Sequence, residues 1–413
     1  MTTTATYNNV KTNIAWMPEL PEHWKLSRVK NYFTFSNEVV GVDYSGFNVL
    51  SLSVNGVIIR DMESGKGKHS MSMDLYQIVQ PKSIILCLFD MDVTPRIVGI
   101  CENLGIITSA YTTIVPKENV CERFYYYFFL HQDYNKSLKA QGTGVRTTLT
   151  NTQFGAVKIP VPPYQEQIQI ANYLDTQSQK INHFIAKKQQ FIALLKEQKN
   201  VVAYDKIFVN GGKENYPNRR IKSISKILRG KFSHRPRNDE RLYNGEFPFI
   251  QTGEVSQADK YINNYRQTLN EWGYSVSKEF PKGTLCLTIA ANVGDVAILN
   301  FNACFPDSII GIVPNPEVGL DYMYFALRSL KAKFISEATL TTQYNLNIER
   351  VGPIKIPLPS LEIQESIVAQ IEIETATIDT AIAKTEREIE LIKEYKEAMI
   401  AEAVMGKVNY NKK

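Results

Sequence analysis

The residues best suited to chemistry form a basic stretch between residues 219 and 241. It holds nine Lys or Arg residues against only Asp239 and Glu240. Lysine and arginine neutralise phosphates, and a guanidinium can also bond the edge of a guanine at two points. A solvated protein surface would explain the same run, so both interpretations stay open. If the stretch binds DNA, the expected contacts are Arg229, Lys231, His234, Arg235 and Arg237.

Weaker candidates for nucleic-acid contact are scattered over the rest of the chain. The first half has a Gly-rich loop with two lysines and a histidine, an arginine after Asp92-Val93-Thr94-Pro95, and an Arg-Thr-Thr sequence. An ordinary structural role explains each of them equally well or better. These candidates are Lys66, Lys68, His69, Arg96, Arg146 and Thr147, together with Asn292 in the second half.

Two segments are similar to catalytic or cofactor motifs but lack the essential residues. Val161-Pro162-Pro163-Tyr164 is similar to the Asn/Asp-Pro-Pro-aromatic site of amino-methyltransferases, but valine has no oxygen to accept a bond from an amine. Gly142-Thr143-Gly144 lacks the third glycine and the acidic partner of a dinucleotide site, and the sequence has no P-loop. The five histidines are scattered without metal-ligand spacing. The sequence therefore predicts no catalytic residue and no metal site.

Length and composition describe a globular protein. The 413 residues are 44% hydrophobic and 22% charged, which is enough for two or three domains with real cores. The net charge of +5 is too small to identify a partner. The five cysteines include no CxxC pair, which favours a reducing cytoplasm over a disulfide framework. No apolar run is long enough to predict a signal peptide or a membrane span.

An internal repeat organises the chain. Shifting the sequence by 197 residues superimposes Lys158-Ile159-Pro160 on Lys355-Ile356-Pro357 without a gap. The match continues downstream as far as Lys199 on Lys396, and upstream into an aromatic segment. The chain therefore consists of two copies of a unit of roughly 190 residues, a period too long for a solenoid. In each copy the variable part comes first and the better-matched part second.

The better-matched part of each copy predicts a long helix. Apolar residues follow a ladder of alternating steps of three and four from Gln167 to Val202 and from Gln364 to Met399, which is typical of a coiled coil. Prolines mark the start of each helix, because proline is excluded from a helix interior. The ladder residues expected in helix pairing or in docking an external partner are Ile170, Leu174, Ile181, Phe184, Phe191, Leu195, Ile367, Ile371, Ile378, Ile392, Tyr395 and Met399.

The charges of the two helices favour their pairing with each other. Residues 166–199 carry five lysines and three acids, whereas residues 362–402 carry four bases and eleven acids. The net charges of +2 and −7 attract, and they leave +10 on the rest of the chain, where the globular parts lie. A self-packed helix pair is favoured over helices that bind only an external partner, although both roles are compatible.

The variable parts predict two compact α/β units of the mixed α+β kind. Each combines short β-rich runs, such as residues 83–89 and 284–290, with an aromatic segment that we expect to be helical. The predicted segments are an N-terminal segment (1–23), a first variable domain (24–160), a first helix (161–210), a linker (211–218), a second variable domain (219–357) and a second helix (358–410).

The duplicated order of these motifs resembles the specificity subunit of type I restriction-modification systems over nearly the whole chain. The resemblance rests on the repeat, on Leu20-Pro21-Glu22-His23-Trp24, and on the paired Ile-Pro-Val/Leu-Pro sequences that open the two helices at 159 and 356. The second copy departs from the family pattern, because Asn218-Arg219-Arg220-Ile221 lacks the Pro-Glu-His-Trp sequence. The start of the second copy is therefore less well defined.

The resemblance implies that each variable part is a target recognition domain for one half of a bipartite, asymmetric site in double-stranded DNA. The two helices would form an antiparallel coiled coil that holds the domains apart and docks two methyltransferase subunits, with restriction/translocase subunits in the full complex. Helical residues 167–202 would span ~54 Å, the length of about 16 base pairs. The chain itself would be non-catalytic, cytoplasmic and without a membrane partner, while S-adenosylmethionine, ATP and Mg would act on the partner subunits.

Two other classes of protein remain as alternatives. A coiled-coil scaffold without DNA specificity would explain the helices, but it would not explain the positive charge on the globular parts. A stand-alone DNA adenine methyltransferase would need the cofactor loop and the Asn/Asp-Pro-Pro-aromatic site that the sequence lacks.

Overall fold

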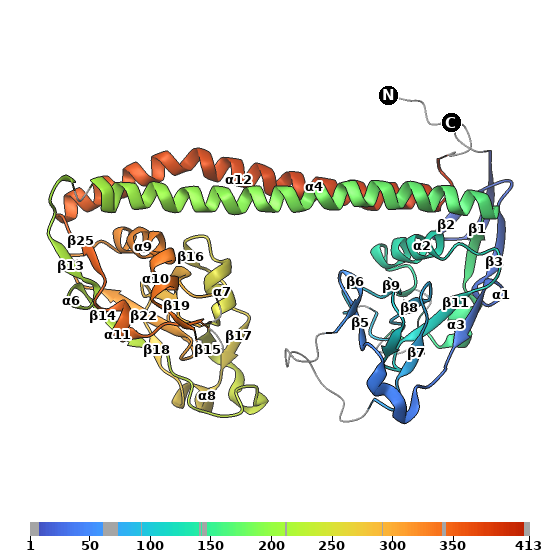
Figure 1. Cartoon of the computed structure of the whole chain (residues 1–413), viewed down its shortest axis with the longest axis horizontal. Coiled ribbons are helices and arrows are strands. Elements are labelled where there is room, and N and C mark those ends of the chain that lie inside the picture. The colour runs from blue at the N-terminus through green and yellow to red at the C-terminus, as the bar shows by residue number, and fades with distance from the viewer. Residues whose placement is uncertain are drawn as a thin grey trace. The chain divides into compact units, whose positions relative to one another are not determined.

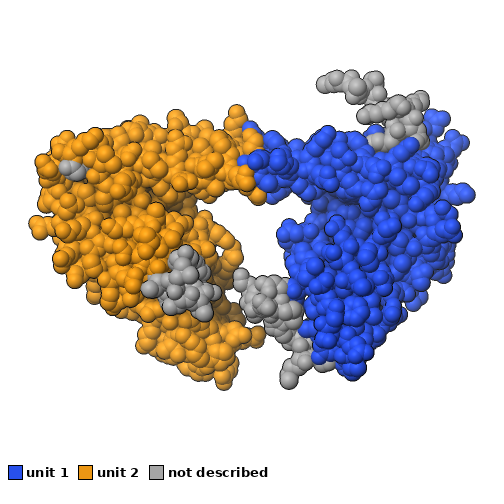
Figure 2. Space-filling model, viewed as in Figure 1, with its two compact units in different colours: residues 1–187, 387–413 blue, residues 188–386 orange. Residues whose placement is uncertain are grey.

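The computed structural model of the chain describes residues 8–60, 73–91, 93–139, 142, 147–210, 213–290, 292–340 and 344–408. The chain forms two compact units: unit 1 comprises Met1–Lys187 and Arg387–Lys413, and unit 2 comprises Lys188–Glu386 (Figure 2). Each unit contains a domain of helices and strands together with segments of both long helices. The predicted class, duplicated mixed α/β domains each followed by a long helix, is confirmed.

The domain of unit 1 is built on a four-stranded antiparallel sheet with the order β4-β11-β8-β9. β-branched residues dominate the inner strands and pack well on a pleated surface. Helix α2 lies between this sheet and the long helices and adds five buried aromatic rings to the core (Figure 1). The elements are β1 (Asn9–Ile14), β2 (Met17–Pro21), β3 (Lys25–Arg28), α1 (Val29–Tyr32), β4 (Phe33–Ser36), β5 (Leu50–Ser53), β6 (Gly56–Ile59), β7 (Gln77–Val79), β8 (Ile84–Leu86), β9 (Val98–Ile100), β10 (Gly105–Ile107), β11 (Thr112–Pro116), α2 (Glu122–Tyr134), α3 (Asn151–Ala156) and β12 (Lys158–Val161).

The domain of unit 2 repeats this frame and enlarges it. Its main sheet has the order β14-β22-β19-β20-β16, and a second sheet of order β17-β15-β21-β18 is added. Helix α9 takes the place of α2, as the aromatic segment predicted. The elements are β13 (Asn218–Arg220), α6 (Ile221–Ile224), β14 (Ser225–Arg229), β15 (Tyr243–Phe249), α7 (Thr252–Gln257), β16 (Tyr261–Ile262), β17 (Gln267–Leu269), α8 (Glu271–Ser275), β18 (Glu279–Phe280), β19 (Leu285–Thr288), β20 (Val296–Leu299), β21 (Ala303–Cys304), β22 (Ile309–Pro314), α9 (Leu320–Ser329), α10 (Lys331–Glu337), β23 (Thr339–Leu340), β24 (Tyr344–Asn345), α11 (Ile348–Val351) and β25 (Lys355–Pro357).

A short strand pair joins the beginning and the end of each domain. In unit 1, β12 pairs with β3 and places Lys158 opposite Arg28. In unit 2, β25 pairs with β13 and places Lys355 opposite Arg220. Arg220 is therefore the counterpart of Arg28, which defines the start of the second copy. Asn218, which the composition had placed in the linker, is the first residue of β13 because it pairs with Pro357.

Two long helices, α4 (Tyr164–Tyr204) and α12 (Leu361–Val404), each begin within two residues of a proline, as predicted. In unit 1, Lys396 of α12 donates to the Asn182 side-chain oxygen of α4 at 3.0 Å. In unit 2, Lys199 of α4 forms an ion pair with Asp379 of α12. Residue numbers rise along one helix as they fall along the other, so the helices are antiparallel. The predicted attraction between a basic and an acidic helix is confirmed by the Lys199 pair and by a second one between residues 206 and 374.

The predicted ladder residues divide into a buried and an exposed set. Phe184, Phe191 and Tyr395 are 40%, 45% and 56% exposed. Leu195 and Ile392 are half-buried. The other seven are buried: Ile170, Leu174, Ile181, Ile367, Ile371, Ile378 and Met399. Packing within the units accounts for the buried set, whereas the exposed set leaves apolar surface on the helices.

The last turn of α12 completes the core of unit 1. Met399, Ile400, Ala403, Val404 and Met405 belong to the same apolar cluster as Trp24 and α2. The chain then turns at Gly406, whose φ of 67° suits glycine. A Cβ at this position would lie 2.3 Å from the Pro21 Cγ atom, so a larger residue does not fit without a shift. The Pro21–Trp24 motif therefore packs against the turn that follows α12.

A buried glutamine anchors the domain of unit 1 to the first turn of α4. The Gln167 side chain, which is 1% exposed, donates to the Pro162 carbonyl at 2.9 Å. Its oxygen accepts the N–H of Cys121, just before α2, also at 2.9 Å. The Tyr125 hydroxyl of α2 adds a bond to the Pro160 carbonyl at 3.1 Å. These bonds join α2 directly to the start of the long helix.

The same glutamine anchor recurs in unit 2. The Gln364 side chain, also 1% exposed, donates to the Pro359 carbonyl at 2.9 Å and accepts the Gly319 N–H at 2.8 Å. The Tyr322 hydroxyl donates to the Pro357 carbonyl at 2.7 Å. In both units the glutamine at the start of the long helix thus bonds a carbonyl of the preceding proline segment and the backbone N–H just before α2 or α9.

We expect Gln364→Ala to lower the free energy of unfolding of unit 2 by about 1–3 kcal/mol, because it leaves buried backbone groups without partners. Urea denaturation of the full chain, followed by circular dichroism, measures the change as a shift of the transition midpoint. Gln198→Ala provides the matched control, since Gln198 is exposed on α4. Equal midpoints for the two variants would contradict the anchoring role.

Candidate nucleic-acid interface

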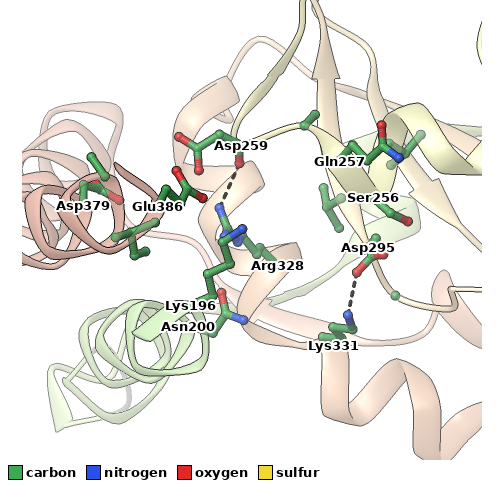
Figure 3. Close-up of a pocket in the computed structure, with 16 residues that line it drawn as sticks. Lys196, Asn200, Ser256, Gln257, Asp259, Asp295, Arg328, Lys331, Asp379 and Glu386 are labelled. Carbon is green, nitrogen blue, oxygen red and sulfur yellow. Dashed lines mark hydrogen bonds and ion pairs between the residues drawn. The ribbon is translucent and has the colours of Figure 1, made fainter. Parts of the chain in front are cut away.

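A cavity of about 560 Å³ lies in unit 2 between the domain and both long helices (Figure 3). Lys331 is paired with Asp295 across its wall, and Arg328 donates to the Asp259 carbonyl at 3.0 Å. Its charged lining residues are Lys196, Arg328, Lys331, Asp259, Asp295, Asp379 and Glu386. Because four acids face three cations, this cavity does not suit a polyanion such as nucleic acid.

Three arginines of the predicted basic stretch converge on one aspartate elsewhere in unit 2. Arg237 forms an ion pair with Asp307, and the Arg235 Nη2 atom lies 3.8 Å from the Asp307 Oδ2 atom. Arg229 donates its Nε–H to the Asp307 carbonyl at 2.7 Å. Arg229 ends β14 and Asp307 precedes β22, and these two strands are neighbours in the sheet. We call Arg229, Arg235 and Arg237 the arginine cluster.

Asp239 organises residues 234–241, which belong to the loop that follows β14 and also carries Arg235 and Arg237. Its carboxylate accepts bonds from the Arg241 Nε and Nη2 atoms at 3.0 and 2.8 Å and lies 2.9 Å from the His234 Nε2 atom. The hydrogen bond from Arg241 is the largest of the effects that hold the pKa of Asp239 well below its usual range. The Trp272 ring of α8 contacts both His234 and Arg241. Its centre lies 5.4 Å from the centre of the His234 ring and 5.2 Å from the Arg241 guanidinium. These contacts fix the loop that carries the basic residues.

Positive charge prevails on this surface. The side chains of Arg235, Arg237 and Arg241 are 55%, 46% and 73% exposed. Residues 229–241 together with Asp307 contain five Lys or Arg residues and three acids. Helix α8, which carries Trp272, lies at the end of unit 2 opposite the long helices (Figure 1). Exposed guanidiniums in such a surplus can bind phosphate groups at this end of the unit.

The structure brings together some of the predicted contact residues and separates others. The arginine cluster and His234 share one surface, and Lys231 is exposed in the same loop. Asn292 lies apart and donates to the Ser256 hydroxyl at 3.0 Å. Thr147 is a half-buried turn residue of unit 1 with a φ of 42°. Lys66, Lys68, His69 and Arg146 lie outside the described residues.

Arg96 is engaged within unit 1. Its Nε atom lies 3.6 Å from the Asp133 Oδ2 atom, and its guanidinium lies 5.2 Å from the centre of the Tyr134 ring. Its side chain is only 19% exposed. The structure therefore gives Arg96 a role in packing the β8–β9 connection against α2, and its contact with DNA stays a prediction.

Sequence reasoning missed the residues that organise this surface. Asp307 lies far along the chain from the arginines, and only the pairing of β14 with β22 brings it to them. No local pattern marks it. Arg241 belongs to the predicted basic stretch, and its position two residues after Asp239 was the signal for a local ion pair. Trp272 carried no signal in the sequence.

Other chemical groups are unreactive or sparse in the part of the chain that the structure describes. The five cysteines are free and buried. Burial raises the pKa of their thiols, to about 11 for Cys304, which keeps them protonated and poor nucleophiles. Among the described residues no group of three or more His, Cys, Asp or Glu side chains could hold a metal ion. None of the helices described there is long and apolar enough to cross a membrane.

The sequence matches a known protein family across both units. The family is described as "Type I restriction modification DNA specificity domain", and the match covers residues 105–193 and 213–391, well over half of the chain. The chain belongs to this type I specificity family. The matched ranges of the specificity chain include α2 and α9 and the starts of both long helices, which are the parts that the glutamine anchors join.

Individual relatives agree with this assignment. The specificity chain is 24% identical over 234 residues to a Mycoplasma pneumoniae protein named as a type I specificity subunit, covering 55% of this chain and 58% of that protein. It is 26% identical over 314 residues to a protein of Methanocaldococcus jannaschii named as the type I restriction enzyme MjaX specificity subunit, covering 71% and 70%. The alignments thus span 58% of the first relative's own length and 64% of that of a Haemophilus influenzae relative.

A solved structure shares the fold. A chain from the structure "Structural basis underlying complex assembly and conformational transition of the type I R-M system" superimposes with a TM-score of 0.53 at 15% identity. The superposition covers 93% of the specificity chain and 98% of the other chain. This likeness supports the duplicated architecture with its long helices.

Neutralising Asp307 tests the electrostatics of the basic surface. Asp307→Asn removes one negative charge and releases Arg237, so we expect tighter binding to a DNA duplex of arbitrary sequence. The slope of log affinity against log salt should grow by about one unit. Fluorescence anisotropy over a salt series measures both quantities. Glu349→Gln makes the same charge change on exposed α11 and should leave the slope unaltered, so equal slopes for the two variants would contradict the arrangement.

Proposed function

We propose that this chain is the DNA specificity subunit of a type I restriction-modification complex and that it recognises a bipartite, asymmetric site in double-stranded DNA. The observation that carries the proposal is the construction of the chain from two units with the same frame and different outer parts. Unit 1 adds the strand pairs β5-β6 and β7-β10 to the frame, whereas unit 2 adds the sheet β17-β15-β21-β18. Two different surfaces on one frame would recognise two different half-sites.

The arginine cluster would hold the DNA phosphates at unit 2. Its exposed guanidiniums lie on the same surface as Lys231 and Arg241, and the cations there outnumber the acids. Phosphate contacts fix the register of a protein on the duplex but carry no sequence information by themselves. Discrimination between bases would therefore come from neighbouring side chains that reach the grooves.

The antiparallel helices would act as the spacer that separates the two half-sites. Ion pairs and the buried ladder residues hold α4 and α12 together, and the glutamine anchors tie a domain to the start of each helix. A helix of 41 residues, such as α4, is ~60 Å long, which corresponds to more than one turn of duplex DNA. A rigid spacer of this kind would set the number of unread base pairs.

Catalysis would take place on partner subunits. We infer that two methyltransferase subunits dock on the long helices, where Phe191, Leu194 and Tyr395 expose apolar surface. Val161, which stands where a methyltransferase has Asn or Asp, is buried in β12 and pairs with Lys25, which supports a non-catalytic role. S-adenosylmethionine would act on the methyltransferases, and ATP with Mg on the restriction subunits. Five free thiols fit a complex that works in the reducing cytoplasm.

Co-expression with a type I methyltransferase subunit from the same genome tests this function. We expect the two proteins to co-purify and the host DNA to acquire N6-methyladenine in one gapped, asymmetric motif, read by single-molecule sequencing. Cells with the methyltransferase alone serve as the control and should lack the motif. A stable complex that neither methylates a gapped motif nor binds DNA would favour a coiled-coil scaffold instead.

Lengthening both helices tests the spacer. One heptad inserted after Lys187 in α4 and one after Glu386 in α12 adds ~10 Å while keeping the apolar ladder in phase. The gap in the methylated motif should grow by a few base pairs, with both half-sites unchanged. An unaltered gap in the methylome of the lengthened protein would refute a ruler made of these helices.

A further inference from the structure

A hollow with an aromatic floor borders the arginine cluster in unit 2. It measures about 270 Å³. Phe232, Tyr243 and Phe249 form its floor, and the Phe232 ring centre lies 5.0 Å from that of Phe249 and 6.1 Å from that of Tyr243. Phe232 and Phe249 are buried, so the floor is a fixed part of the domain. Arg237 of the arginine cluster stands at the edge of the hollow.

Three carboxamide side chains and Pro306 form the rest of the rim. Gln251 donates its side-chain N–H to the Gln267 oxygen at 3.1 Å. The two residues are adjacent because Phe249 of β15 pairs with Gln267 of β17 in the antiparallel register. Asn238, in the basic loop, completes the rim. The contact with Gln251 restrains the Gln267 carboxamide, which lines the hollow.

Donors and acceptors on this rim are available to a ligand. Within the described part of the chain, no residue hydrogen-bonds the Gln267 amide nitrogen or the Asn238 side chain. The Gln267 oxygen keeps a second lone pair beside the one that Gln251 uses. Each carboxamide can therefore offer one N–H and one oxygen side by side. That pair matches the N7 acceptor and the N6 amino donor of adenine in the major groove.

We propose that this amide-rimmed hollow recognises an A·T base pair in the half-site bound by unit 2. This inference rests on the proposed function and adds to it the residues that would choose the base. Gln267 would bond the adenine N7 and N6 groups, and Asn238 would donate to the thymine O4 acceptor. The aromatic floor would receive the thymine methyl group, which favours apolar contacts. Arg235 and Arg237 would hold the adjacent phosphates, so positioning and base choice come from one surface.

Substitutions at the rim test the proposal in the co-expressed complex, with the methylome as the readout. Gln267→Ala and Asn238→Ala should each relax the motif at one A·T position of one half-site, lowering discrimination there by roughly 5- to 100-fold. The other half-site and the gap should stay unchanged. Gln267→Glu replaces a donor by an acceptor and should shift the preference at that position from adenine towards cytosine.

Asn264→Ala is the matched control, because Asn264 is another exposed amide of unit 2 that does not line the hollow. It should leave the motif as it is. An unchanged motif with both Gln267→Ala and Asn238→Ala, or relaxation in the other half-site, would overturn the assignment of the hollow. The wild-type arm separates this result from a failure of the proposed function, since a wild-type complex without a gapped motif overturns both. A variant that fails to fold will not co-purify with the methyltransferase. The other of the two variants, Gln267→Ala or Asn238→Ala, then tests the assignment of the hollow.

Discussion

The attachment of each domain to the first turn of a long helix is the constraint on which the rest of the structure depends. Each long helix follows a proline segment whose Pro162 or Pro359 carbonyl lies in a buried hydrogen bond. Gln167 and Gln364 bond the carbonyls there and, in the same step, the amide that precedes α2 or α9. The orientation of the domain on its helix is thus fixed by directional bonds rather than by apolar contact alone. The position of the outer surface of each unit relative to its long helix therefore depends on these bonds.

The two copies share the glutamine anchor and differ in their outer parts. The tyrosine and glutamine bonds recur in both units with the same acceptors on the proline segment. The sheets beyond the shared frame differ in strand number and order. Buried polar groups tolerate little change, because an unpaired one costs free energy, whereas exposed loops carry no such penalty. The differences in sheet topology therefore lie in the outer parts of the units, away from the glutamine anchors.

The long-range plan of the molecule could be predicted from the sequence because it rests on patterns that repeat. The apolar ladder, the prolines and the opposite charges predicted the helices, and the Lys199–Asp379 ion pair bears out the charge argument. The basic stretch pointed to the surface that Asp307 and Asp239 organise. Asp307 and the rim glutamine Gln267 could not be predicted, since strand pairing brings each to its partners from a distant segment. Trp272 reaches the basic loop from helix α8, which no local pattern indicated. Four of the predicted contacts of unit 1 lie outside the described residues.

The division of the chain into units also determines which core can be completed first during synthesis. Unit 2 contains no residue beyond Glu386. The core of unit 1, in contrast, includes Met399, Ile400 and Val404, and Gly406 packs closely against Pro21. During synthesis the core of unit 1 cannot be completed before residues 399–404 have been made, whereas every residue of unit 2 precedes them. Domains usually finish in the order in which they are made. In this chain the unit that begins first is the one that finishes last.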